Sequence, residues 1–301
     1  MSVNTPISTE QGKFYGLPAA GESQGEKKRL DERHEAWSQY FRGDLWLAIA
    51  EIAKMDPRRI IDLGHYCHSF EIVFGGLARA IQAALQFPDA QVVGLDMSPL
   101  PDRQIPGNMS FQLGDLTKEL NLEPNSFDIV HARSVMCHVP NAIEAIQRAA
   151  DLVKPGGLLL LLDVDMSTML TTGGSRVYNY ISALIPLYQK RGADFEIGRK
   201  LQDMMTSLGR FQSVQCHKVS LPFNGKAQDE ATSQLSVATR KSWTRGVQVA
   251  GKPPEGFTET IIKEYVEELN EEDCTAVWDG PISITETYLE IKTRLAFTSL
   301  R

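Results

Sequence analysis

The sequence predicts a doubly wound, mostly parallel α/β sheet with additional helices that form a cap. Short apolar runs alternate with amphipathic segments between residues 58 and 164. The runs are continuous in Val, Ile and Leu, which is typical of strands buried on both faces. Strands that alternate with helices favour right-handed crossovers, and therefore a parallel sheet.

Five apolar runs are the expected strands of the parallel part: 58–63, 91–96, 109–113, 127–133 and 158–164. Helical spacing of apolar residues predicts helices over 30–54, 74–86 and 142–153. Gly43 is expected to divide the first of these, and Lys154-Pro155-Gly156-Gly157 to stop the last. Each strand is thus followed by a helix or a short loop.

The pattern changes after residue 165. Helices are expected over 176–190, 195–208, 229–248 and 258–269, and strands over 213–221 and 282–292. The second half therefore reads as the end of the sheet with inserted cap helices in about 166–210 and 229–270. We expect a disordered tail over 1–28 and one domain over 29–301.

Composition narrows the class of protein. The net charge of -7 and the absence of a basic stripe argue against a nucleic-acid partner. The longest apolar run is too short to span a bilayer, and the polar N-terminus lacks a secretory signal. Four scattered cysteines without a CxxC pair indicate a reducing compartment and no zinc site. We therefore expect a cytoplasmic protein with no membrane partner and no metal.

In a doubly wound sheet, ligands bind beyond the carboxyl ends of the strands, at the switch point. Asp62 and Gly64 close the first run, and Asp96 and Met97 close the second. The third run is followed by Gly114-Asp115-Leu116, and the fourth ends in His131-Ala132-Arg133. Acids after three successive strands are far less expected by chance than one alone. These residues are the candidate ligand site.

The series RRIIDLG, VVGLDMSP, FQLGDL, NSFDIVHAR and LVKPGGLLLLLDV resembles the ordered motifs of class I S-adenosylmethionine-dependent methyltransferases. LDERHEAW and GRKLQDMMTSLGRFQSVQCHKVSLPFNG add a likeness to the fungal branch associated with secondary metabolism, over roughly residues 28–225. The resemblance implies a seven-stranded sheet of Rossmann-like type whose last hairpin is antiparallel. It implies S-adenosyl-L-methionine as the cofactor.

The resemblance also assigns roles at the strand ends. Asp96 would bind the ribose, Asp115 and Leu116 the adenine, and Gly64 the methionine part, while His131 to Ser134 would line the methyl-donor site. The expected cofactor-binding set is Asp62, Gly64, Asp96, Met97, Gly114, Asp115, Leu116, His131, Ala132 and Arg133.

The first loop departs from the family, which has Asp-Leu-Gly-x-Gly-x-Gly where this chain has DLGHYCH over 62–68. In one interpretation 65–70 is an insertion, and Gly75-Gly76 supplies the close approach to the cofactor. In the other, Tyr66 and His68 intrude and weaken binding. A metal site at His65, Cys67 and His68 lacks further ligands.

His138 follows the fourth strand and matches a histidine common in this loop of the family, so it is the candidate catalytic residue. The implied reaction is methyl transfer, with O-methylation expected, to a small, largely apolar metabolite. Two alternatives stay open: a cyclisation or rearrangement without net methylation, motivated by the altered loop, and a non-catalytic regulatory protein. A homodimer also stays open.

Overall fold

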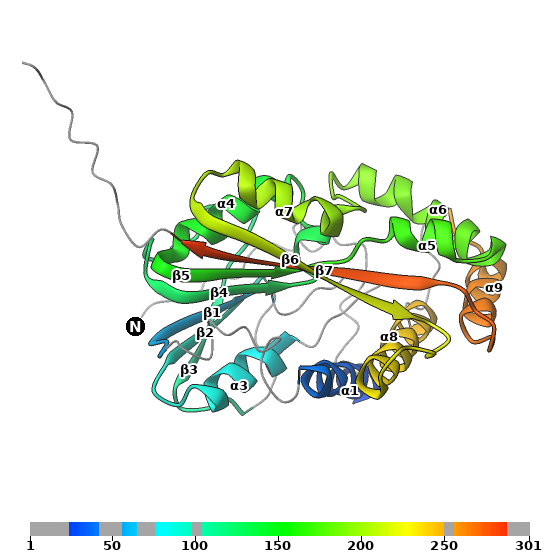
Figure 1. Cartoon of the computed structure of the whole chain (residues 1–301), viewed down its shortest axis with the longest axis horizontal. Helices are drawn as coiled ribbons and strands as arrows, with labels where there is room; N and C mark the ends of the chain where they lie inside the picture. Colours follow the sequence, from blue (N-terminus) through cyan, green and yellow to red (C-terminus); the bar gives the residue numbers. More distant parts are fainter. Residues whose placement is uncertain (1–23, 42–55, 65–75, 98–103, 250–255, 288–301) are drawn as a thin grey trace, which may run out of the picture.

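The computed structural model describes residues 24–41, 56–64, 76–97, 104–249 and 256–287 (Figure 1). Its centre is one seven-stranded sheet with the order β3-β2-β1-β4-β5-β7-β6. The strands are β1 (Arg59–Leu63), β2 (Gln91–Asp96), β3 (Met109–Leu113), β4 (Phe127–Arg133), β5 (Val153–Leu162), β6 (Phe211–Pro222) and β7 (Val277–Thr287).

The sheet is wound in both directions from its centre. β1 pairs in parallel with β2 on one side and with β4 on the other, so the switch point lies between β1 and β4. β7 is antiparallel to both β5 and β6. The predicted fold, including the antiparallel last hairpin, is confirmed.

Most strand boundaries agree with the apolar runs, and two do not. β5 begins at Val153 rather than at residue 158, because Val153 already pairs with Phe127 ahead of the leucine run. β7 begins at Val277 rather than at residue 282, because Val277 and Trp278 pair with the end of β6. The prediction that this strand reaches residue 292 extends past the described residues.

The helices form two layers and an end group. They are α1 (Gln24–Tyr40), α3 (Gly76–Gln86), α4 (Ala142–Leu152), α5 (Ser167–Thr172), α6 (Ser175–Lys190), α7 (Ile197–Ser207), α8 (Glu230–Val249) and α9 (Glu259–Leu269). α4 and α7 cover one face of the sheet, while α3, α1 and α8 lie on the other (Figure 1). α5, α6 and α9 gather at one end of the molecule (Figure 1).

This arrangement refines two expectations. α7 and α8 pack directly against sheet strands and α5 contacts β7, whereas α6 packs against α5 and α9 at the end of the molecule. α1 begins at Gln24, inside the segment expected to be a disordered tail. Among the described residues, no helix has the length and apolar character needed to cross a bilayer.

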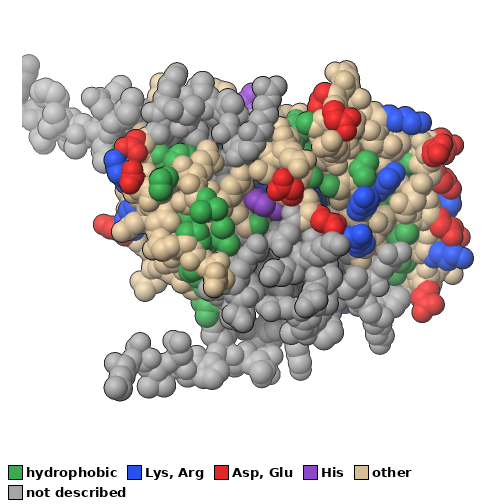
Figure 2. All heavy atoms as spheres, turned by 90° about the horizontal axis from the view of Figure 1, so that it is seen from below, with side chains coloured by type: hydrophobic (Ala, Val, Ile, Leu, Met, Phe, Trp, Pro, Cys, Tyr) green, Lys and Arg blue, Asp and Glu red, His purple; other side chains and the backbone are tan. Residues whose placement is uncertain are grey.

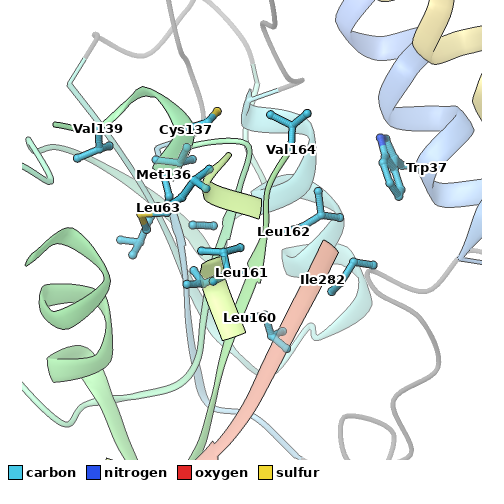
Figure 3. Close-up of a cluster of buried hydrophobic side chains, with 14 of the residues drawn as sticks. Trp37, Leu63, Met136, Cys137, Val139, Leu160, Leu161, Leu162, Val164 and Ile282 are labelled. Carbon is cyan, nitrogen blue, oxygen red and sulfur yellow. The ribbon is translucent and has the colours of Figure 1, made fainter. Parts of the chain in front are cut away.

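The core is centred on the leucine run of β5. All five side chains of Leu158–Leu162 are buried, and Leu63, Met136 and Ile282 surround them (Figure 3). Each buried side chain of this size stabilises the fold by about 1.5–3 kcal/mol. Trp37 joins α1 to the sheet, since its ring lies 6.1 Å from that of Trp278 in β7. The core therefore fixes the strand ends and α1 in one unit.

Candidate functional site

The carboxyl ends of β1, β2 and β4 converge at Gly64. Its backbone φ is +63°, a value that residues other than glycine rarely adopt, and its N–H donates to the Leu95 carbonyl at 2.7 Å. A Cβ at this position would lie 2.8 Å from Cγ1 of Val135. Glycine is therefore required for the chain to leave β1 between its two neighbours.

The ends of β2 and β3 form the next part of the same edge. Asp96 is buried, and its carbonyl accepts a hydrogen bond from the Gly114 N–H at 2.8 Å. A Cβ at Gly114 would lie 2.8 Å from the Leu95 side chain. Beside them, the apolar residues Met97 and Leu113 are 42% and 55% exposed.

Asp115 and Leu116 follow in a tight turn. The Asp115 carboxylate accepts hydrogen bonds from the N–H and hydroxyl of Thr117 at 2.9 and 2.7 Å, and Lys118 lies 3.3 Å away. Burial raises the pKa of Asp115, but these partners outweigh it and the net pKa is lowered. Leu116 is buried, and its carbonyl accepts a hydrogen bond from Arg148.

Four ionisable side chains meet between β1, β4 and α3, and we call them the β1–β4 cluster: Asp62, Arg79, His131 and Arg133. Nδ1 of His131 lies 2.8 Å from one Asp62 oxygen, and Nε of Arg79 donates to the other at 3.3 Å. Arg79 also donates to the backbone carbonyl of Arg133 at 3.1 Å. All four residues are buried.

Burial dominates the electrostatics of this cluster. It lowers the pKa of His131 to about 4, although the hydrogen bond and charge of Asp62 act in the opposite direction. Burial and then the charge of Arg79 lower the pKa of Arg133, against the effect of Asp62. At neutral pH, His131 is therefore an uncharged ring held by Asp62.

His138 lies at the end of a short 3₁₀ helix, η2 (Met136–His138), after β4. Its ring lies 6.2 Å from that of Tyr188 in α6. Burial, with a smaller effect of Arg191, lowers its pKa to about 3. A neutral imidazole of this kind is a weak base but can accept a hydrogen bond.

Asp163, directly after β5, holds the loop that carries His138. One of its carboxylate oxygens accepts the N–H groups of Val135, Met136 and Cys137 at 3.1, 2.8 and 3.3 Å. Burial raises the pKa of Asp163, and hydrogen bonds from the Cys137 side chain and from the N–H groups of Val164, Cys137 and Met136 oppose that effect. The loop begins at Ser134, whose left-handed φ of +55° is rare for serine.

The structure thus brings the predicted residues to one edge in two groups. Asp62, His131 and Arg133 lie together in the β1–β4 cluster, beside Ala132, which is buried in the same strand. Asp96, Met97 and Gly114 lie at the ends of β2 and β3, with Asp115 and Leu116 directly after them.

Sequence reasoning did not single out Arg79 or Asp163. Asp163 carried a usable signal, since it is the acid that ends a buried strand, as Asp96 is. Arg79 carried none, because one arginine in an alanine-rich helix reads as exposed. The question of the 65–70 loop lies outside the described residues, as do His65, Cys67 and His68. Within the described residues, no group of His, Cys, Asp and Glu could hold a metal ion.

The chain is similar in sequence to known methyltransferases. A family model described as a methyltransferase domain matches residues 34–208. Methyltransferase str3 of Strobilurus tenacellus is 33% identical over 235 residues, covering 77% of this chain and 80% of the relative. Methyltransferase str2 of the same fungus is 31% identical over 217 residues, covering 71% and 79%.

A solved structure of Haemonchus contortus phosphoethanolamine N-methyltransferase 2 with S-adenosyl-L-methionine is 16% identical. It aligns with a TM-score of 0.47 over 89% of this chain and 61% of that protein. The family match covers more than half of the chain and includes every residue of the candidate site. This chain therefore belongs to the class I S-adenosylmethionine-dependent methyltransferases, in the branch that includes these fungal members.

Proposed function

We propose that this chain methylates an oxygen atom of a small, largely apolar metabolite, in secondary-metabolite biosynthesis, with its cofactor bound along the carboxyl edge of β1, β2 and β4. The observation that carries the proposal is the grouping at that edge of a buried acid, Asp96, with two exposed apolar side chains, Met97 and Leu113. A nucleoside needs both: an acceptor for its ribose hydroxyls and apolar surface for its base.

The residues at this edge fit the cofactor by their size and chemistry. Internal packing requires Gly64 and Gly114, because a Cβ there would lie 2.8 Å from Val135 or Leu95, and these positions therefore present only backbone at the strand ends. Asp96 is assigned to the ribose, and Leu116 with the turn at Asp115 to the adenine. Asp62 is assigned an indirect role, because Arg79 and His131 already occupy its carboxylate.

When bound, S-adenosylmethionine supplies an electrophilic methyl group on a positively charged sulfur. The protein then has to hold an acceptor oxygen in line and exclude water, which can contribute several kcal/mol through orientation alone. His138 is assigned to the acceptor, as a neutral ring that accepts a hydrogen bond from a hydroxyl. Tyr188 beside it, and Phe195 with its ring 6.1 Å from that of Tyr188, supply the apolar surroundings that favour an apolar substrate.

The cofactor assignment is tested by calorimetric titration with S-adenosylhomocysteine, the stable product. We expect wild type to bind and Asp96→Ala to lose at least about tenfold in affinity, or about 1.4 kcal/mol. Asp89→Ala, an exposed acid in the turn before β2, is the matched control and should bind as wild type does. Absence of binding to folded wild type contradicts the proposal.

The acceptor assignment is tested by incubation with methyl-labelled S-adenosylmethionine and a panel of phenols, enols, carboxylic acids and amines. Mass spectrometry of the products identifies the methylated atom. Label on oxygen, lost in His138→Ala but retained in His217→Ala on β6, supports the proposal. Label on nitrogen alone contradicts it.

A further inference from the structure

The β1–β4 cluster contains two guanidinium groups and one carboxylate. Arg79 and Arg133 are 2% and 4% exposed, and Asp62 is 3% exposed. Arg79 uses Nε on Asp62 and Nη1 on the backbone carbonyl of Arg133. Nη2 of Arg79 and Nε of Arg133 have no hydrogen-bond acceptor within the described structure.

The charges in this cluster do not balance. His131 is neutral above a pKa of about 4, so two cations face one anion among these four side chains. A buried guanidinium without a full set of acceptors is costly, because the energy of its lost hydration is not replaced. Such a group is retained where a ligand completes it, and the excess of one positive charge matches a monovalent anion.

The excess positive charge lies at the carboxyl ends of β1 and β4, where doubly wound sheets bind their ligands. Arg133 is the last residue of β4, and Asp62 lies one residue before the end of β1, on the two sides of the switch point. Cζ of Arg133 lies 5.5 Å from the centre of the Trp37 ring, which approaches from α1. The indole N–H of Trp37 is also buried without an acceptor in the described residues. N–H groups of Arg79, Arg133 and Trp37 are thus buried without acceptors at this end of β1 and β4.

We propose that Arg133 and Arg79 form a carboxylate-binding site, completed by a ligand and not by the protein. A carboxylate carries one charge and presents two oxygens to a guanidinium in one plane, whereas a dianion would be repelled by Asp62. The proposal rests on the proposed function for its place at this edge. The carboxylate has two sources there: the amino-acid part of the cofactor, or an acidic substrate.

Three probes distinguish these sources in wild type and Arg133→Gln. S-adenosylhomocysteine carries the carboxylate, 5′-methylthioadenosine is the same thioether nucleoside without it, and phenylacetate is a simple apolar acid. We expect Arg133→Gln to lower the affinity for a probe that carries a carboxylate by at least about tenfold, and to leave the affinity for 5′-methylthioadenosine unchanged. Arg58→Gln, at the opposite end of β1 and exposed, is the matched control and should change none of them.

If Arg133→Gln loses affinity only for S-adenosylhomocysteine, the site binds the carboxylate of the cofactor. If it loses affinity only for phenylacetate, the site binds the carboxylate of the substrate. The inference is overturned if S-adenosylhomocysteine binds Arg133→Gln as wild type does and phenylacetate binding is absent or unchanged. If neither nucleoside binds wild type, the proposed function fails, and an Arg133-dependent phenylacetate site would still stand.

The melting temperature of the ligand-free protein supplies a second readout. Because Arg133 is incompletely paired, Arg133→Gln should melt at the wild-type temperature or above it, and should gain less from S-adenosylhomocysteine or phenylacetate than wild type gains. Arg79→Gln, which removes the partner of Asp62, should melt lower. A ligand-free Arg133→Gln protein that melts as far below wild type as Arg79→Gln would show that Arg133 is structural and overturn the proposal.

Discussion

Two clusters of charged side chains built around buried acids lie at strand ends of the same sheet, and they differ in how many of their N–H donors find an acceptor within the protein. In the β1–β4 cluster, two arginines lie with one acid, Asp62, to which Arg79 donates, and N–H groups of both arginines lack acceptors within the described residues. The second, which we call the β5–β7 cluster, contains Asp165 and Asp279 and the side chains that donate to them: Ser167, Thr168, Arg199, Lys218 and Ser220.

In the β5–β7 cluster, each acid has its own cation. Arg199 donates to Asp165 at 2.8 Å, and Lys218 pairs with Asp279. The Ser220 hydroxyl donates to Asp279 at 2.6 Å. A buried charged group whose hydrogen-bond partners all come from the protein stabilises the local fold. A buried charged group that lacks partners in the protein points to a ligand that supplies them.

The charged side chains of the outer surface are arranged differently from those of the two clusters. On the face in Figure 2, basic and acidic side chains lie interspersed at the end formed by α8 and α9, and hydrophobic side chains gather over α3 and β3. The coloured part of this face therefore shows no continuous basic stripe. The charge imbalance that matters lies inside, at the β1–β4 cluster.

The largest expected effect is the removal of an acid from the completed cluster. Asp279→Ala removes the buried carboxylate that accepts hydrogen bonds from Ser220 and Thr168, so we expect a loss of about 3–5 kcal/mol in the free energy of unfolding, whereas the exposed Lys218 adds little. Urea denaturation measures it. Asp273→Ala, an exposed acid nearby, should stay within about 0.5 kcal/mol of wild type. Similar stability of the two variants would contradict the comparison.

Acid should destabilise the protein through the β1–β4 cluster. The folded pKa of His131 is about 4, below its unfolded value near 6.5, so the unfolded chain takes up the proton first as pH falls. Its contribution to stability is fully present above pH 6.5 and is lost between pH 6.5 and about 4, on the order of 3 kcal/mol.

Denaturation at a series of pH values measures this loss. His131→Gln should flatten the curve in that window without abolishing the slope, because His138, with a pKa of about 3, contributes in the same direction. A curve for His131→Gln parallel to that of wild type would show that His131 is not buried in its neutral form.

A smaller effect is expected at the start of α6. Glu268 of α9 accepts the N–H groups of Gly174, Arg176 and Val177 at 2.7, 3.0 and 3.3 Å, and so completes the first turn of that helix. Glu268→Gln should cost about 1–2 kcal/mol in thermal unfolding.

Glu271→Gln is its matched control, because Glu271 contacts the same Arg176 side chain but at the surface, where solvent screens the ion pair and leaves it little effect on stability. Equal losses in the two variants would show that the backbone contacts of Glu268 do not matter.

The smallest expected effect concerns exposed leucines. Leu113→Ser should leave the melting temperature unchanged and weaken S-adenosylhomocysteine binding a few-fold, because Leu113 is assigned to the base of the cofactor. Leu85→Ser on α3 removes a leucine that is even more exposed, 69% against 55%, and should bind as wild type does. Equal S-adenosylhomocysteine affinities of the two variants in calorimetry would show that Leu113 does not contact the cofactor.

Sequence reasoning succeeded where one physical signal dominates. The runs at 91–96 and 127–133 match β2 and β4 inside the sheet, because a strand buried on both faces must be continuously apolar. The run at 109–113 also matches β3, although this is an edge strand in which Ser110, Gln112 and Leu113 are exposed. The acids at the strand ends could be named for the same reason, since they interrupt that apolar pattern.

What the sequence could not provide depends on contacts between distant residues. The pairing of Asp62 with His131 spans 69 positions, and that of Arg79 with the Arg133 carbonyl spans 54. Asp62 and His131 were predicted as separate contacts of the cofactor, and only the register of β1 against β4 joins them. The early start of β7 was missed because Gly280 and Pro281 read as a break rather than as part of a strand.

Hydrogen–deuterium exchange with and without S-adenosylhomocysteine tests the comparison most directly, because it reports both clusters in one experiment. We expect the ligand to slow exchange at the ends of β1, β2 and β4, around Gly64, Met97 and Ser134, and to leave exchange in β6 and β7 around Ser220 and Asp279 unchanged. Slowed exchange confined to the β5–β7 cluster, with none at the ends of β1, β2 and β4, would contradict it.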